Sequence, residues 1–187
     1  MFLNGFFVRS SVLLVDWLLA PVVWLVVAWG ARRQRVIAEQ GEPLTERESA
    51  LARRAGVHSV NQVRVLTVDV IPMPLPRVVT RLATRAGLLS PHIAGMTLGH
   101  GITLRADCRH DARLLAHELT HVAQVERLGG LHPFMRAYVR ECAWPGYPRG
   151  PLEQEARAAE HLAMADVLPY TPPKNVPSGI AGLSSVQ

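Results

Sequence analysis

Residues 111–130 read DARLLAHELTHVAQVERLGG, and apolar side chains recur in them at helical spacing. Asp111 is a favourable N-cap, and Gly129 followed by Gly130 provides a stop signal. This stretch therefore predicts an amphipathic helix with one face buried in a protein core.

The helix contains His117-Glu118-Leu-Thr-His121. Two histidines four residues apart lie on one helix face, so both imidazoles can reach one metal ion at about 2.0–2.1 Å. Glu118 projects to a different side of the helix, where it is suited to accept a proton from a metal-activated water. A catalytic zinc site also needs a third protein ligand and one position left open for water.

The third ligand is expected on a later helix. Residues 151–157 read PLEQEAR and follow a loop rich in Pro and Gly, and His161 lies a few residues further on. Glu153 and Glu155 are two apart and cannot both face one ion, so either of them remains a candidate. Glu160 is expected to pair with an arginine, and His161 and His100 to be ordinary histidines. Gln124 is equally compatible with an exposed position and with a bond to His121.

HELTHVAQ followed by PLEQEAR resembles the minimal gluzincin domains of bacteria, which are HExxH-plus-Glu zinc metallopeptidases. It is also similar to the catalytic core of HtpX-like membrane zinc proteases, and the resemblance covers about residues 97–165. It implies a zincin-like α+β fold, in which the active-site helix and a glutamate-bearing helix pack on a small sheet. It also implies one zinc ion per chain, with Glu153 as the last ligand. Arg157 stands where these families usually have an acidic residue.

In such a site Glu118 would act as general base, and a further donor would stabilise the tetrahedral oxyanion. Tyr147 is the first candidate for that donor because it precedes Glu153 in the same loop, and Tyr138 and His132 are the alternatives. Residues 97–104 are expected to form a strand pair or a bulged strand around Gly99 and Gly101, which could pair with an extended peptide substrate. A helix over 46–55, a strand over 63–70 and helices over 133–142 and 152–167 complete the predicted elements.

Residues 12–29 read VLLVDWLLAPVVWLVVAW, with Asp16 as the only charged residue. Eighteen residues span about 27 Å as a helix, close to the thickness of a hydrocarbon core, so the run predicts one transmembrane helix. A signal peptide and a buried core helix are the alternatives. Arginines at 32, 33 and 35 place the C-terminal portion in the cytoplasm by the positive-inside rule. The expected organisation is a membrane anchor over 1–35, a metallopeptidase domain over 36–168 and a flexible tail over 169–187.

The chain has 187 residues and a net charge of +5. Its arginines are scattered rather than clustered on one segment, which argues against a nucleic-acid partner. These features predict a zinc-dependent endopeptidase held in the inner membrane of a bacterium, acting on a peptide or protein. A zinc-stabilised membrane module that binds a partner without catalysis, or a zinc hydrolase of a non-protein amide, are the alternatives. The sequence does not indicate an oligomeric state.

Overall fold

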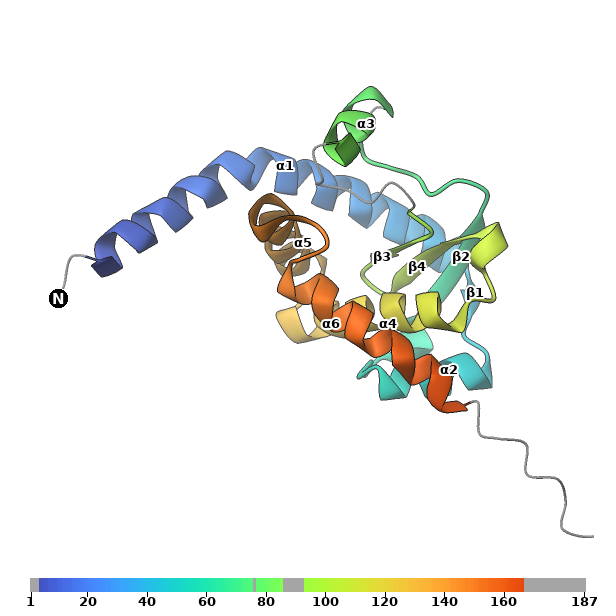
Figure 1. Cartoon of the computed structure of the whole chain (residues 1–187). Coiled ribbons are helices and arrows are strands. Elements are labelled where there is room, and N and C mark those ends of the chain that lie inside the picture. Colours follow the sequence, from blue (N-terminus) through green and yellow to red (C-terminus); the bar gives the residue numbers. More distant parts are fainter. Residues whose placement is uncertain (1–3, 76, 86–92, 167–187) are drawn as a thin grey trace, which may run out of the picture.

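The computed structural model describes the backbone of residues 4–75, 77–85 and 93–166, and within them the side chains except those of 4–18, 77, 83 and 164–166. It is an α+β structure with a small mixed sheet (Figure 1). The helices are α1 (Asn4–Gln40), α2 (Glu46–Arg54), α3 (Arg77–Arg85), α4 (Ala112–Leu128), α5 (Leu131–Glu141) and α6 (Pro151–Ala159). The strands are β1 (Glu42–Pro43), β2 (Arg64–Val68), β3 (Gly95–Leu98) and β4 (Gly101–Arg105).

The sheet has the order β1-β2-β4-β3. β2 and β4 run parallel, whereas β1 and β3 pair antiparallel with β2 and β4, respectively. β3 and β4 form a hairpin, and Gly99 in its turn has a φ of +64°, a conformation that favours glycine. β3 therefore lies at an edge of the described sheet, with one side unpaired.

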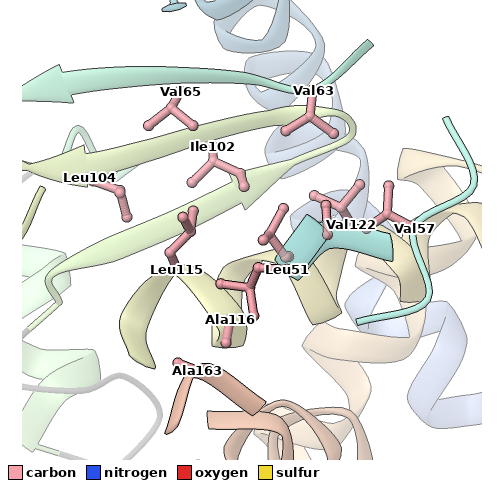
Figure 2. Close-up of a cluster of buried hydrophobic side chains, with 12 residues drawn as sticks. Leu51, Val57, Val63, Val65, Ile102, Leu104, Leu115, Ala116, Val122 and Ala163 are labelled. Atoms are coloured by element: carbon pink, nitrogen blue, oxygen red, sulfur yellow. The ribbon is translucent and has the colours of Figure 1, made fainter. Parts of the chain in front are cut away.

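One sheet face packs on α4 and α2. Val65, Ile102 and Leu104 of the strands meet Leu115 and Leu119 of α4, and all five are almost completely buried. Figure 2 shows these strand side chains above α4, with Ala163 closing the cluster from below. Because side chains alternate along a strand, the neighbouring residue Leu66 points to the other face.

The C-terminal part of α1 covers that second face. Ile37 is fully buried, and a Cβ on Gly101 would lie 3.0 Å from Ile37, so the helix approaches the strand closely. Earlier in α1, Val26 and Trp29 pack against the buried cluster that includes Phe134 of α5. The helix thus continues through residue 35, where a domain boundary was expected, and joins the core.

The expected transmembrane helix over 12–29 is unsupported. Within the described residues, no helix combines the length and apolar character needed to cross a membrane. Residues 12–18 of the expected span lie outside the described side chains. In the remainder, Val23 is 6% exposed and Val26, Val27 and Trp29 contact the domain, so part of the apolar surface is used in packing.

The expected element boundaries agree with the structure where local capping determines them. Asp111 caps α4 through the backbone N–H groups of Arg113 and Leu114, and Gly129 ends the helix with a φ of +89°. Thr45 and Glu48 form the capping box of α2. The α3 helix was not expected, and α6 ends earlier, with a 3₁₀ segment over Glu160–Asp166 continuing from it. The tail over 169–187 lies outside the described residues.

Candidate metal centre

α4 places His117 and His121 one turn apart, and their Nε2 atoms are 3.2 Å from each other. The two rings meet edge to face, and the His121 side chain is buried beside Phe134 and Tyr138 of α5. The helical spacing seen in the sequence therefore brings both nitrogens to one point at the surface of α4.

α6 brings Glu153 to the same point. Its carboxylate oxygens lie 3.4 Å from His117 Nε2 and 3.6 Å from His121 Nε2, and the side chain is only 5% exposed. Ligands at 2.0–2.1 Å in a tetrahedral zinc site are about 3.4 Å from one another. The two distances involve different Glu153 oxygens, Oε1 for His117 and Oε2 for His121, and one ligand atom from each residue can be chosen so that all three lie within 4.8 Å of one another, so the donor set could hold a metal ion.

The outer nitrogens of both imidazoles face oxygen acceptors. His117 Nδ1 lies 3.2 Å from Glu160 Oε1, and His121 Nδ1 lies 2.8 Å from Gln124 Oε1. Gln124 Nε2 donates to the Leu152 carbonyl oxygen, so its Oε1 is the atom left to accept from His121. With Nδ1 protonated in each ring, Nε2 carries a lone pair, which is the form that binds a metal.

The structure adds to two expectations about these partners. Glu160 contacts Arg113 at 3.8 Å, as expected, and it also bonds His117. Of the two alternatives left open for Gln124, the structure has the buried one, in which its side chain bonds His121. The Glu160 contact depends on how the 3₁₀ segment packs on α4, and the burial of Gln124 on how α6 does, and the spacing of residues reveals neither.

The two Nε2 atoms and the Glu153 carboxylate repel one another when none of them carries a proton. The pKa values of His121 and Glu153 are shifted accordingly. Burial lowers the pKa of His121, but the Glu153 hydrogen bond and the Glu118 charge outweigh burial, and the pKa is raised overall. Burial raises the pKa of Glu153, but His121 and His117 lower it more. Both shifts favour a positive charge between these groups, which is the place that a cation would take.

Glu118 projects from α4 toward β3 and lines the same cavity as His117, His121 and Glu153. The Thr97 hydroxyl donates to the Glu118 carboxylate at 2.6 Å, and Glu118 is buried. A Cβ at Gly95 would overlap the Glu118 carboxylate, so a larger residue at this strand position would force the Glu118 side chain to move. The sequence pointed to the general-base candidate but did not indicate Thr97 or Gly95 as its neighbours.

Glu155, the alternative ligand, points elsewhere. Its two oxygens accept from Arg127 at 2.7 Å each, and Gln124 donates to it as well. Glu155 thus links α6 to α4 beside the site, while Glu153 reaches the histidines. His100 bonds Glu126 on the other side of α4, and His161 is exposed.

The three candidates for the donor that would stabilise the oxyanion lie at different positions. The Tyr138 hydroxyl donates to Glu153 Oε2 at 3.2 Å, and burial raises its pKa well above the ordinary value. Tyr147 is half-buried, lies near the Arg157 guanidinium and has a pKa raised first by burial and then by the Glu153 charge. His132 is exposed and does not line the cavity at the site.

A cavity of about 610 Å³ opens at this cluster. Its polar floor contains His117, Glu118 and Glu153, together with the Arg157 side chain. Its walls are mostly apolar and come from α1, the segment before α3, β3 and α5. The residues that form these walls include Leu19, Val22, Val26, Trp29, Met73, Leu75, Met96, Leu98, Phe134 and Val139.

The chain matches the eCIS core domain family over residues 77–129. The match includes α3, the β3–β4 hairpin and α4 with its two histidines, and it ends before Glu153. It covers less than half of the chain. No curated protein and no solved structure matches.

Proposed function

We propose that the chain is a zinc-dependent metallopeptidase in which His117, His121 and Glu153 hold the metal. The observation that carries this proposal is the convergence of these three donors, whose ligand atoms lie within 4.8 Å of one another, next to a separate buried carboxylate, Glu118. A purely structural zinc site is usually closed by four protein ligands. Among the described residues the cluster has three such donors, which leaves one coordination position for solvent.

Zinc in such a site lowers the pKa of a water molecule toward neutrality and polarises a substrate carbonyl. Glu118 accepts the water proton during attack and delivers it to the leaving amine. Thr97 holds the Glu118 carboxylate in place for both transfers. Glu160 and Gln124 keep the two imidazoles in the metal-binding tautomer throughout.

Tyr147 is the proposed donor to the oxyanion. It is half-buried, lines the cavity and lies in the loop that leads to Glu153. Tyr138 is the alternative donor, and the hydroxyls of both tyrosines interact with Glu153. The unpaired side of β3 lines the same cavity, and an extended peptide could add to this edge with its scissile carbonyl near the metal.

We also propose that residues 12–29 associate the chain with the inner membrane of a bacterium, with the C-terminal portion in the cytoplasm. The support comes from sequence: the run has a single acid, and Arg32, Arg33 and Arg35 follow it. Trp24 is 72% exposed and Leu25 45%, so packing on the domain leaves apolar surface uncovered.

The decisive experiment compares the native chain with Glu118→Gln. The variant should bind one zinc per chain and lose nearly all turnover, by about 10²–10⁴-fold, since only proton transfer is removed. Turnover is followed with labelled casein, and substrates are sought by comparing N-terminal peptides from cells carrying either form. Double substitution of His117 and His121 by Ala should remove the metal. Zinc binding with no product that depends on Glu118 would instead favour a non-catalytic module.

A further inference from the structure

The α3 helix presents its apolar side to the outside of the molecule. Val78 is 69% exposed, Leu82 58% and Val79 42%, and the helical period places them on one face. Figure 1 shows α3 standing apart from the sheet. A surface helix of a soluble domain normally shows the reverse arrangement, with its apolar stripe toward the core.

The side of α3 that carries Thr80 and Thr84 is turned toward the protein. Both residues line a second cavity, of about 730 Å³, with Asp69 just after β2 and Arg105 at the end of β4. Their hydroxyls donate to backbone carbonyls, at 3.3 Å and 3.0 Å. Arg81 and Arg85 also border this cavity but are exposed, and the apolar face lacks cover among the described residues.

We propose that this apolar face of α3 lies on the surface of an anionic lipid bilayer. Three side chains are far too few for a stable protein interface, which buries about 800 Å² on each partner, whereas they suit shallow insertion among lipid headgroups. Arg85 is exposed and borders the apolar face, so its guanidinium can reach lipid phosphates, whereas Arg81 lies further around the helix on the polar side. The chain as a whole carries a net charge of +5, which favours an anionic surface.

A bilayer in contact with α3 would also lie next to the cavity at the proposed metal centre. The segment immediately before it, including Met73 and Leu75, forms one wall of the cavity at the metal centre, and α1 contributes another wall. α1 also exposes Val22 and Trp24. A bilayer beneath α3 would place this side of the cavity next to the lipid surface. The inference stands whether or not the site hydrolyses peptides.

The test uses the full chain reconstituted in vesicles, because α1 could bring it to lipid without any contribution from α3. Cys108 and Cys142 are replaced by Ser, and one fluorophore is attached through Leu82→Cys. Arg81→Cys is the matched control, since it is the adjacent position on the polar side. Quenching is compared between a nitroxide lipid and aqueous iodide, in phosphatidylcholine alone and with about one third phosphatidylglycerol.

We expect the probe at position 82 to be quenched by the lipid nitroxide and protected from iodide, and the probe at 81 to behave in the opposite way. The difference should be larger with phosphatidylglycerol and shrink in about 1 M salt, where the screening length falls to about 3 Å. Equal accessibility at both positions would overturn the proposal, as would an identical result in the two lipid mixtures. Protection that rises with protein concentration in the absence of lipid would overturn it in favour of self-association. Circular dichroism of each variant confirms that it is folded.

Discussion

In the proposed metal site, each imidazole faces one acceptor at its outer nitrogen. Gln124 is the more constrained of the two acceptors, because its amide group donates to Leu152 and Glu155 while its oxygen faces His121. This residue therefore couples the tautomer of a ligand on α4 to the backbone of α6. Glu160 supplies the corresponding contact to His117. Residues that bond the outer nitrogens of metal ligands orient those ligands, and their replacement weakens metal binding.

Replacement of Gln124 by Leu should weaken zinc binding by about 10–100-fold, because His121 loses the acceptor that holds its Nδ1 proton. Competition with a chromophoric chelator measures the dissociation constant. Gln154→Leu is the matched control, since Gln154 is exposed and its side chain bonds the Pro148 carbonyl rather than a ligand. Equal zinc affinity in the native chain and the Gln124 variant would show that the amide does not orient the ligand.

Thr97 is expected to act on the general base rather than on the metal. Thr97→Val removes a hydrogen bond to a carboxylate, and kcat should fall by about tenfold or more while zinc content stays at one per chain. Thr97→Ser keeps the hydroxyl and should restore most of kcat. A rise in KM with unchanged kcat for Thr97→Val would contradict this role, since it would place Thr97 in substrate binding.

At the scale of elements, Glu126 occupies a position that helix electrostatics disfavours, in the last turn of α4. Its carboxylate accepts from the backbone N–H groups of His58 and Ser59, at 2.7 Å and 2.9 Å, and contacts His100 at 2.9 Å. It thereby joins the α2–β2 loop and the β3–β4 turn to α4. Burial raises its pKa, but these hydrogen bonds outweigh burial and the pKa is lowered.

The lowered pKa of Glu126 has a defined effect on stability. A carboxyl group whose folded pKa lies below its unfolded value stabilises the protein above that unfolded value, about 4.5, and the contribution is lost as the pH falls through the folded pKa. Glu126→Gln should therefore lower Tm at pH 6–7, and the deficit should shrink toward pH 3. Thermal melts of the two proteins across this range test the expectation. A deficit that is independent of pH would indicate lost packing instead of lost charge.

The elements that the sequence predicted well are those bounded by their own capping residues. Asp111 with Gly129, and Thr45 with Glu48, determine where α4 and α2 begin or end through local hydrogen bonds. The shared face of His117 and His121 on α4 follows from the helical period alone. The Glu160 contact with His117 was not expected, and Gln124 was left open between two positions, because both depend on contacts between elements distant in sequence. α3 was missed because it follows a proline-rich segment and its apolar face does not point to the core.

At the scale of the whole molecule, the apolar surface of α1 is packed on the domain in part and exposed in part. In the sequence, residues 12–29 form one apolar run. In the structure, Val23 and Val26 pack on the domain, whereas Trp24 is exposed. A hydropathy value is summed over a window of residues, so it does not distinguish apolar surface that packs on the domain from apolar surface that is free to contact lipid. The fold class could be expected from the sequence, but the use of α1 as a wall of the cavity could not.

Zinc should stabilise the whole fold because its ligands join α4 to α6. At a metal concentration about 1,000 times Kd, binding stabilises by about 4 kcal/mol, which corresponds to an increase of about 10 °C in Tm for a chain of this size. Adding a chelator should remove this increase, and re-adding zinc should restore it. His117→Ala combined with His121→Ala is the control, because its Tm should be insensitive to zinc. If calorimetry gave the native chain the same Tm with zinc and with chelator, the three donors would not bridge the two helices through a metal.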